Sequence, residues 1–574
     1  MKVLGIHFQS HDASVALVEN GNILYAASNE RFSRRKMDAD APLEVLRDCF
    51  SYLKIKPQDI DKVVFVGDPF PYSYLGRFKE LSWSVILTKG KYLMWWKKPH
   101  LILWELLIAT GIPSFLYREL LPRILIKLQL KGFKGGYLYV HHHFAHMYSA
   151  YYTSGWKDCL VMCSEGSGFS ETMSIYHVKQ GKWIKVVENY LPNSAGKFYE
   201  LVTVMLGFDV LRHPGKITGL AAYGNPNTVY NAVKDLLWVD GLKLRLNYKK
   251  YLKWRISYSL TKTLPKELRG NKREDIAAAF QRRLEECIIE IVKKAVKKTG
   301  EKKLAFAGGV AANVKLNQKL HEKAGINEIY IHQAMGDDGL ALGAALHTAF
   351  LNGFKVKRPD NVYFGPDFSE QEIKKSLNKF NLQFSKEKNI EVKVAKLLAK
   401  GKIVARFNGR MEYGPRALGN RSILYKTTDI GVNNWLNKRL KKRSDFMPFA
   451  PVTLESFADK CFKNLKGAEY TARFMTITLD VTPYMKKISP AVVHVDGTAR
   501  PQIIRSKGNP SYYKLLKEYY KLTGIPSLIN TSFNMHEEPI VCTPDDAIKS
   551  FLSGSLDYLA IGNYLVSYEE NNKK

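Results

Sequence analysis

The sequence has few cysteines and no long apolar run. Six cysteines occur in 574 residues, and they are scattered instead of grouped at regular spacings. Scattered cysteines do not form a disulfide framework, so we expect a reduced, cytoplasmic protein. The longest uncharged run in the tryptophan-rich part of the chain covers residues 106–117, which is shorter than the roughly 20 residues that a transmembrane helix needs. No basic segment followed by an apolar run opens the chain, so we expect a β-strand there and no signal peptide.

Acidic residues are also scarce, with 54 Asp and Glu against 87 Lys and Arg, which gives a formal net charge of +33. This charge favours contact with polyanions or anionic membrane surfaces, although a lysine-rich solvated surface is an equally good interpretation. The hydrophobic content of 45% and the charged content of 25% exclude a disordered, collagenous or coiled-coil protein. A chain of 574 residues is too long for one ordinary core, so we expect at least two domains.

The chain opens with three predicted strands at residues 2–8, 13–18 and 23–28. A Glu-Asn-Gly turn joins the last two strands, and a polar loop that contains His11 joins the first two. The same order of strands and loop occurs in nucleotide-binding folds of the actin and sugar-kinase type, where the loop faces the phosphates. A surface hairpin is equally consistent with these residues.

Four histidines lie between residues 141 and 146. His142 and His146 are four residues apart, so a helix places both imidazoles on one face, about 5–6 Å apart at Cβ. His141 and His143 do not share that face. Without a carboxylate ligand from elsewhere in the chain, packing is the better interpretation of this spacing.

Two glycine-containing turns further along the chain follow predicted strands. The first contains Gly308 and Gly309 and leads to Asn313, where a nucleotide can approach the backbone and the positive end of a helix. Taken alone, this glycine pair is a weak motif. The second turn carries Asp337 and Asp338, which are either helix caps or the missing anionic ligand.

Two regions interrupt the alternation of strands and helices. Residues 71–136 combine tryptophans with a basic excess. The favoured interpretation is a helical lid packed on its own domain. The alternative is an amphipathic insertion that contacts a membrane or an apolar substrate. Around residues 353–386, proline, glycine and a charged helix predict a domain boundary.

Positive groups are concentrated among glycines and small residues in the C-terminal part. Residues 408–422 contain three arginines, including Arg416, and Lys441, Arg443 and Arg500 follow. A guanidinium group can donate two parallel hydrogen bonds to two oxygens of one phosphate or carboxylate. We therefore favour an anion site over surface salt bridges. A further strand runs into polar side chains that suit a planar or phosphorylated group: Asn530, Thr531 and Ser532.

Long motifs follow one another along nearly the whole chain. Among them are HHFAHMYSAYYTSGW, LAFAGGVAANVKLN, GDDGLALGAA, GRMEYGPRALGNRSIL and LINTSFNMHEEPIV, in that order. Together they resemble the carbamoyltransferase family that includes the nodulation carbamoyltransferases and antibiotic O-carbamoyltransferases. The resemblance implies an α/β fold, with a duplicated ASKHA-type (actin/sugar-kinase-like) domain over residues 1–360, which contains the insertion at 71–136, and a YrdC-like α/β domain over residues 385–574.

The resemblance also implies a reaction in two steps. Carbamoyl phosphate and ATP, the latter with Mg²⁺, form carbamoyl adenylate in the second domain, and the first domain transfers the carbamoyl group to a hydroxyl. A divalent metal, iron or a similar ion, is implied on His142, His146 and Asp337, with Asp338 as a competitor for the third place. Residues implied to act in catalysis are His11, Glu30, Lys441, Arg443, Arg500 and Ser532. Residues implied to contact the nucleotide are Gly308, Gly309, Asn313, Arg416, Asn530 and Thr531.

The sequence departs from the family's pattern at two positions. Glu165 stands where the family usually has Asp, which lengthens the acid by one methylene. Met447 stands where an anion-binding arginine is expected. Loss of one charged hydrogen bond there costs about 1.5–3 kcal/mol, which weakens carbamoyl activation unless Lys442 compensates.

We therefore expect an O-carbamoyltransferase that acts on a sugar, a natural product or an amphiphilic acceptor. Two other interpretations stay open. One is a tRNA-modifying threonylcarbamoyl-type transferase, which is less favoured because no RNA-binding module is recognised, so nucleic acid is not an expected partner. The other is a catalytically impaired scaffold that binds nucleotide or membrane. Peripheral membrane contact is left open, and the sequence does not decide the oligomeric state, with a homodimer among the options.

Overall fold

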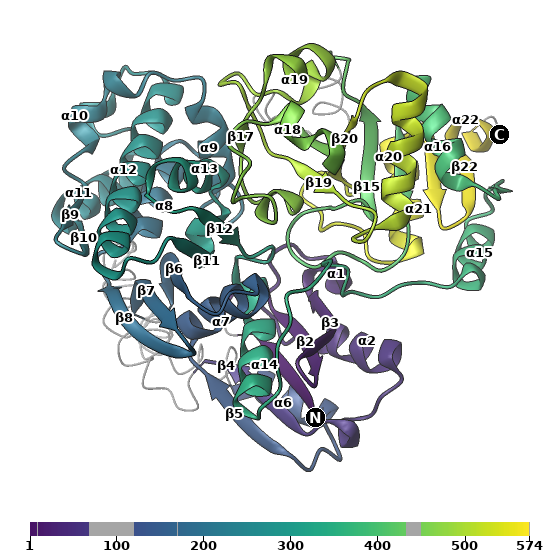
Figure 1. Cartoon of the computed structure of the whole chain (residues 1–574), viewed down its shortest axis with the longest axis horizontal. Coiled ribbons are helices and arrows are strands. Elements are labelled where there is room, and N and C mark those ends of the chain that lie inside the picture. The colour runs from purple at the N-terminus through teal and green to yellow at the C-terminus, as the bar shows by residue number, and fades with distance from the viewer. Residues whose placement is uncertain (9, 68–119, 169, 432–448, 573–574) are drawn as a thin grey trace, which may run out of the picture.

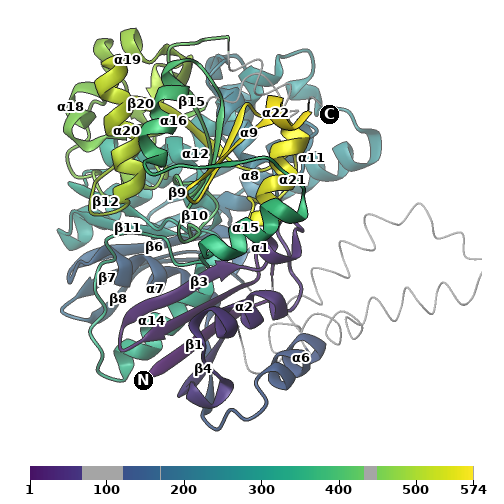
Figure 2. The same cartoon turned by 90° about the vertical axis from the view of Figure 1, so that its right-hand side faces the viewer.

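The computed structural model describes residues 1–8, 10–67, 120–168, 170–431 and 449–572 and has a mixed α/β architecture (Figure 1). Lys441, Arg443 and Met447 lie outside the described residues, as do residues 71–119 of the tryptophan-rich region. The first sheet lies on one side of the molecule and the C-terminal region on the other (Figure 2). In the part of the chain that the structure describes, no helix has both the length and the apolar composition to cross a lipid bilayer.

The first sheet has five strands in the order β3-β2-β1-β4-β5. The antiparallel strands are β1 (Lys2–His7), β2 (Ser14–Glu19) and β3 (Asn22–Ser28), which confirm the three strands predicted at the start of the chain. Parallel to β1 run β4 (Lys62–Val66) and β5 (Gly136–Val140).

The second sheet repeats this arrangement in the order β8-β7-β6-β11-β12. Here β6 (Cys159–Gly168), β7 (Glu171–Lys179) and β8 (Lys182–Tyr190) are antiparallel, whereas β11 (Lys303–Ala307) and β12 (Glu328–Ile331) run parallel to β6. Both sheets therefore share one strand order and one pattern of strand directions. The predicted duplication of the N-terminal fold is confirmed.

The helices α7 (His142–Ser154) and α14 (Leu340–Leu351) pack against each other and against strands of both sheets. Small residues permit this close packing. A Cβ at Gly343 would overlap the backbone of α7 at Ala145, and a Cβ at Gly5 would overlap the carbonyl group of Ala341. Because α7 and α14 approach so closely, the first turn of α7 is fixed between the two five-stranded sheets of the N-terminal region.

The other N-terminal helices surround these sheets. The predicted helix near residue 275 is confirmed as α12 (Arg273–Thr299), and Gly300 ends it with a φ of 74°. The remaining helices and strands of this part are α1 (Glu30–Ser33), α2 (Leu43–Leu53), α6 (Leu121–Gln129), α8 (Ala195–Met205), α9 (Pro214–Ala221), α10 (Tyr230–Val233), β9 (Leu237–Asp240), β10 (Lys243–Leu246), α11 (Tyr248–Thr261) and α13 (Val314–Lys323).

The C-terminal region is built on an eight-stranded mixed sheet in the order β13-β22-β21-β14-β15-β20-β16-β19. Its strands are β13 (Ser385–Lys386), β14 (Val404–Phe407), β15 (Arg421–Lys426), β16 (Ala450–Leu454), β19 (Gln502–Ile504), β20 (Ser527–Ser532), β21 (Tyr558–Ile561) and β22 (Tyr564–Ser567). Alternate residues of β14 enter two different cores, because Val404 packs with α16 (Ile390–Ala399) and α20 (Pro510–Thr523) while Ala405 packs with α21 (Pro544–Gly554).

Smaller elements complete this region. They are α15 (Glu370–Lys379), α18 (Ala458–Cys461), β17 (Leu479–Asp480), α19 (Pro483–Ile488), β18 (Thr498–Ala499) and α22 (Tyr568–Asn572). A mixed α/β fold is therefore confirmed for both parts of the chain, and the likeness of the second part to YrdC stays a prediction.

Candidate active site

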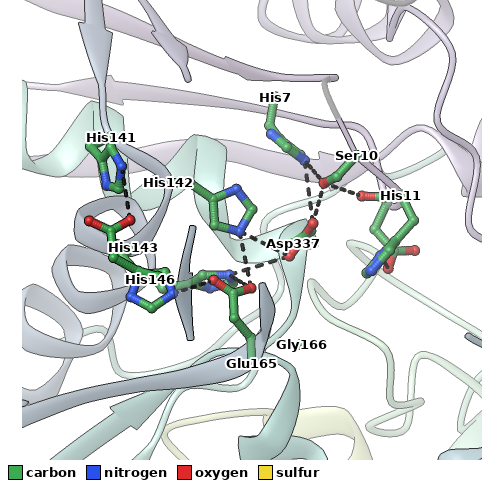
Figure 3. Close-up of polar contacts among 12 residues, drawn as sticks. His7, Ser10, His11, His141, His142, His143, His146, Glu165, Gly166 and Asp337 are labelled. Atoms are coloured by element: carbon green, nitrogen blue, oxygen red, sulfur yellow. Dashed lines mark hydrogen bonds and ion pairs between the residues drawn. The ribbon is translucent and has the colours of Figure 1, made fainter. Parts of the chain in front are cut away.

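Four buried side chains converge at the start of α7 (Figure 3): His142, His146, Glu165 and Asp337. Each offers one ligand atom, and these atoms lie within 4.8 Å of one another. The Nε2 of His142 is 3.1 Å from Oε2 of Glu165, and the Nε2 of His146 is 3.3 Å from Oδ1 of Asp337. Two imidazoles and two carboxylates form a donor set that suits a divalent first-row metal.

The local fold explains why these residues meet. The helix α7 begins at His142 directly after the extended His141, so the i,i+4 pair faces one side, with the two imidazole centroids 5.0 Å apart. Glu165 lies near the end of β6, where the pairing with β7 changes register between Ser164 and Gly168. A Cβ at Gly168 would overlap the Glu165 carboxylate and two histidine rings, so only glycine leaves room for the cluster at this position.

A histidine and a serine hold the second carboxylate oxygen of Asp337. The hydroxyl of Ser10 donates to Oδ2 of Asp337, and Ser10 Oγ lies 2.9 Å from Nε2 of His7. Burial lowers the pKa of His7 to about 3, although Asp337 acts to raise it, so His7 is neutral and can donate to Ser10. Such partners fix the orientation of a metal-binding carboxylate.

Glu165 is held in the same way by a second histidine and serine. Its Oε1 lies 2.7 Å from Nε2 of His143, and Nδ1 of His143 lies 3.1 Å from Oγ of Ser174. His143 does not share the face of the histidine pair, as predicted, yet it contacts the cluster through this carboxylate. Each acid therefore turns one oxygen toward the histidine pair and the other toward a histidine and serine that hold it.

The charges in the cluster compensate one another. Burial opposes protonation of His146, but the carboxylates of Asp337 and Glu165 outweigh burial and raise the pKa of His146 to about 9. Burial also opposes ionisation of the two acids, and the nearby histidines hold both of their pKa values well below the usual range. Among the described residues, Nδ1 of His146 is buried without a hydrogen-bond partner, and Nε2 lies 3.3 Å from Oδ1 of Asp337 and 3.5 Å from Oε2 of Glu165. A buried nitrogen that faces two carboxylates is suited to a cation, so the residues fit a divalent metal.

The predicted glycine turn lies beside this cluster. Because β11 runs parallel to β6, Gly308 follows the strand at the level of Ser164, and a Cβ at Gly308 would lie 2.5 Å from the carbonyl oxygen of Ser164. Gly308 has a φ of 97°, which also favours glycine. No atom would lie within 4 Å of a Cβ at Gly309, so space remains above the turn.

Asn313 has structural partners in this arrangement. Its Oδ1 accepts from the backbone nitrogen of Leu316 and caps α13, and its Nδ2 donates to Oε1 of Gln281 at 2.9 Å. Gln281 in turn accepts from Tyr199 at 2.6 Å and donates to Glu285 at 2.7 Å. We had not predicted this polar network from the sequence, although two polar residues on the apolar stripe of α12 were a signal for it.

The loop of the C-terminal region that contains Arg416 contacts the N-terminal region near the acidic turn at Asp337 and Asp338. The hydroxyl of Tyr413 donates to the carbonyl oxygen of Asp338 at 2.7 Å, and Arg31 donates to the carbonyl oxygen of Gly414 at 2.7 Å. Burial lowers the pKa of Arg416, whereas the nearby Asp338 acts to raise it. The Nε of Arg416 is buried without a hydrogen-bond partner. This guanidinium therefore lies at the junction of the two regions, close to the acidic turn of the first.

The other two arginines of this loop donate to backbone carbonyls, Arg421 through Nη1 alone, while its Nε and Nη2 are buried without a hydrogen-bond partner among the described residues. Arg410 donates to the carbonyl oxygens of Leu24, Phe364 and Gly365. Arg421 donates to three carbonyl oxygens of its own loop, at Asn408, Gly409 and Asn420. Backbone carbonyls of loops need donors when they are buried, so these two arginines hold the fold together.

His11 and Glu30 lie near the acidic turn. Although burial opposes it, the carboxylates of Asp337 and Asp12 raise the pKa of His11 to about 10, and Nδ1 of His11 lies 2.9 Å from Oδ2 of Asp12. Burial raises the pKa of Glu30, which accepts a hydrogen bond from the backbone of Met37. Burial, together with Asp12 and Glu30, also raises the pKa of Asp338 well above its usual range.

The remaining predicted residues lie in the C-terminal sheet region. Asn530 is buried, and its amide donates to the carbonyl oxygen of Ala417 and to Gln502. It thus supports the loop that carries Arg416. Ser532 ends β20 and contacts Asn534, Thr531 precedes it in the same strand, and Arg500 follows β18.

The chain thus has two joined α/β regions, with a cluster of buried ionisable side chains beside their junction. Residues 2–346 match the family description "Carbamoyltransferase N-terminus", and residues 395–568 match "Carbamoyltransferase C-terminus". The chain therefore belongs to the carbamoyltransferase family and is an enzyme of that family.

Individual relatives cover most of the chain. The uncharacterized protein MJ1058 of Methanocaldococcus jannaschii is 33% identical over 99% of this chain and 99% of its own length. Nodulation protein NolNO of Sinorhizobium fredii is 29% identical over 97% of this chain and 79% of its own length. Nodulation protein NolO of Bradyrhizobium diazoefficiens is 34% identical over 74% of this chain and 78% of its own length.

Solved structures give weaker similarities. HypF of T. kodakarensis has 12% identity and a TM-score of 0.36, over 62% of this chain and 48% of that one. Component A of the Acidaminococcus fermentans (R)-2-hydroxyglutaryl-CoA dehydratase has 14% identity and a TM-score of 0.34, over 61% of this chain and 98% of that one.

Proposed function

We propose that the protein is an ATP-dependent O-carbamoyltransferase. Its C-terminal domain, over residues 385–574, makes carbamoyl adenylate in two steps: water cleaves carbamoyl phosphate to carbamate and phosphate, and the carbamate then attacks the α-phosphorus of ATP with release of pyrophosphate. Its N-terminal domain, over residues 1–360, transfers the carbamoyl group to a hydroxyl of a sugar, a natural product or an amphiphilic acceptor, with release of AMP. The observation that carries this proposal is the cluster of His142, His146, Glu165 and Asp337 beside the glycine turn and close to Arg416.

A divalent metal such as iron fits the four donors and, when bound, supplies a Lewis acid that polarises the carbamoyl carbonyl. The protein's own contribution is the orientation of the donors. Ser10 and His143 each fix one acid, so Asp337 and Glu165 do not rearrange when the site fills. The longer Glu165 reaches the cluster from β6, so the departure from the family's usual Asp is accommodated here.

His11 and Glu30 are proposed to act on the reacting groups. Because the pKa of His11 is raised to about 10, this imidazole is protonated at neutral pH and is suited to stabilise negative charge on the carbamoyl or phosphate oxygens. Burial raises the pKa of Glu30, which brings this carboxylate toward the range of a general base for the acceptor hydroxyl.

The positive groups of the second domain are proposed to bind the phosphates. Arg416 is the arginine of its loop whose guanidinium lies beside the acidic turn of the first domain. Lys441, Arg443, Arg500 and Ser532 complete the proposed adenylating pocket, and Asn530, Thr531, Gly308, Gly309 and Asn313 the proposed nucleotide contacts. We place the protein in the cytoplasm, because all six cysteines are free and buried.

The experiment that tests the function uses ¹⁴C-labelled carbamoyl phosphate, ATP and metal-replete protein. The wild-type chain is expected to release pyrophosphate and form labelled carbamoyl adenylate. Asp337→Asn is expected to form the adenylate without passing its label to an acceptor, because this change affects only the N-terminal cluster. If the wild-type chain releases no pyrophosphate under these conditions, the proposal is wrong.

A further inference from the structure

A cavity of about 460 Å³ lies between the two domains, away from the histidine cluster. Trp156, just beyond the end of α7, lines one side of it, and the cluster lies at the start of the same helix. A helix rises about 1.5 Å per residue, so Trp156 and His142 are about 20 Å apart. The cavity is therefore separate from the site already described. It is large enough for a small metabolite, since ligand pockets typically measure about 300–1,000 Å³.

Three arginines converge on this cavity: Arg358, Arg473 and Arg505. The guanidinium of Arg358 lies over the ring of Tyr470, with its central carbon 3.5 Å from the ring centroid. Arg473 lies 5.1 Å from the centroid of the same ring. Burial lowers the pKa of Arg473, and the positive charges of Arg505 and Arg358 lower it further. Like charges this close together favour the binding of an anion.

Most of the acidic residues around the cavity already have other partners, although the charge of Asp360 also acts on Arg473, which donates to the carbonyl oxygen of Asp360. The pairs are Glu455 with Arg505, Asp360 with Lys507, Glu328 with Lys303, and Glu469 with the backbone nitrogen of Gly467. Within the described ranges, neither Arg358 nor Arg473 forms an ion pair with a carboxylate. Asp459, which is exposed at the rim, is a single acid against these two cations.

The cavity is also connected to the helix that carries the histidines. Tyr470 stacks on Tyr330, with ring centroids 5.2 Å apart. The hydroxyl of Tyr330 lies 2.9 Å from Oγ1 of Thr153, which is in the last turn of α7. A molecule in the cavity would thus contact the N-terminal domain at Trp156 and Arg358 and the C-terminal domain at Arg473.

We propose that this cavity is a second ligand site, which binds a phosphate-bearing small molecule through Arg358 and Arg473. Guanidinium groups match phosphate oxygens bidentately, and two of them on one side of a cavity give the fixed geometry that such recognition uses. Trp156 supplies an apolar surface for the rest of the molecule. Because the ligand contacts both domains, it stabilises their packing against each other. The proposal does not depend on the proposed reaction.

The first test is direct observation of an anion. Crystals of the full chain are soaked in millimolar sodium tungstate, an anomalous scatterer with the shape and charge of phosphate. The expected result is an anomalous peak within hydrogen-bonding distance of Arg358 and Arg473. Absence of a peak in an open, solvent-accessible cavity would overturn the proposal.

The second test measures affinity for inorganic pyrophosphate by calorimetry. Arg358→Gln is the main variant, because this exposed side chain contacts Tyr470 and forms no ion pair with a carboxylate in the described structure. We expect Arg358→Gln to lower the affinity of one pyrophosphate-binding site at least 10-fold. Arg47→Gln, which makes the same charge change on the exposed face of α2, is the control and should leave both binding and stability unchanged. Equal affinities for Arg358→Gln and wild type would refute the assignment.

A third arm separates phosphate from carboxylate ligands. Citrate is titrated against the wild-type chain and Arg358→Gln under the same conditions. We expect citrate to compete with pyrophosphate only weakly. If citrate binds more tightly than pyrophosphate and loses this affinity in Arg358→Gln, the phosphate assignment is wrong.

Discussion

The histidine cluster and the arginine loop use their charged residues in opposite ways. In the cluster, each acid turns one oxygen toward His142 and His146, and the other oxygen is held by a histidine and a serine. In the loop, Arg410 donates to backbone carbonyls through Nε and Nη2 and Arg421 through Nη1, and Arg416 lies at the junction of the domains. Charged residues are dense in both motifs. The partners of each atom, not the density of charge, distinguish a binding site from a structural support.

The largest effect is expected for Asp337→Asn. This change removes the negative charge that faces His146 and should lower metal affinity by more than about 100-fold, since losing even an outer-shell partner costs about 10–100-fold. Metal content is measured by mass spectrometry after competition with a chelator. The control is Asp338→Asn, the neighbouring acid outside the four-ligand cluster. If Asp338→Asn lost the metal and Asp337→Asn retained it, Asp338 and not Asp337 would be the metal ligand.

Arg421→Met tests the structural half of the comparison. Three carbonyl oxygens lose a hydrogen bond in this variant, and in the described structure only that of Asn420 keeps another donor, the backbone nitrogen of Asn408, so we expect the free energy of unfolding to fall by about 3 kcal/mol. Chemical denaturation followed by circular dichroism measures this change. Metal affinity should not change in the folded variant. A stable Arg421→Met that has lost nucleotide binding would show that the arginine contacts substrate.

Arg416→Gln should give the reverse result. Among the described residues, no backbone carbonyl accepts a hydrogen bond from Arg416, so its removal should have little effect on stability. Loss of a charged hydrogen bond to a phosphate costs about 1.5–3 kcal/mol, so we expect a fall of about 10–100-fold in the rate of carbamoyl transfer. Rates are measured with saturating metal. A variant with a normal rate and reduced stability would place Arg416 with Arg410 and Arg421.

His143→Ala sharpens the role of the residues that hold the acids. Without His143, Oε1 of Glu165 loses its 2.7 Å contact, and we expect metal affinity to fall by about 10-fold. His141→Ala is the matched control, because His141 contacts Glu171 and is not in the cluster. Both affinities are measured by chelator competition. Equal losses in the two variants would indicate a general effect on α7 and no specific role for His143.

The sequence predicts one part of the site better than the other. The i,i+4 spacing of His142 and His146 fixes their common face on a helix. The turn after a strand offered both Asp337 and Asp338, and the resemblance to the family favoured Asp337. Glu165 was noted only as a departure, because a change of register between β6 and β7 directs it to the cluster. A register change is not visible in the alternation of apolar residues.

The fold of the N-terminal region was predictable because the motifs of the chain resemble those of a known family, and its two sheets share one strand order. The difference in role between Arg416 and the other two arginines of the loop, Arg410 and Arg421, was not predictable from the sequence. Arg410 donates to the carbonyl oxygens of Leu24 and Phe364, which are far from it in the sequence. Only the packing of loops from both domains shows which donors are already used.

The smallest expected effect concerns a charge pair outside both regions, between Lys315 of α13 and Asp496 of the C-terminal domain. Their ion-pair distance is 2.7 Å. Burial opposes ionisation of Asp496, but His494 and Lys315 hold its pKa well below the usual range. A lowered pKa stabilises the folded state above the unfolded pKa of about 3.9, and this stability is lost as the pH falls through the folded value.

Asp496→Asn should therefore reduce the free energy of unfolding by about 1 kcal/mol at pH 7, and the difference from wild type should shrink below about pH 4. Urea denaturation at pH 7, 5 and 3 measures it. Lys315→Met removes the partner from the other domain and should give a similar loss at pH 7. If Asp496→Asn instead lowered metal affinity as Asp337→Asn does, this ion pair would be coupled to the histidine cluster. Residues at the domain interface could then not be divided into those that bind ligands and those that only stabilise the fold.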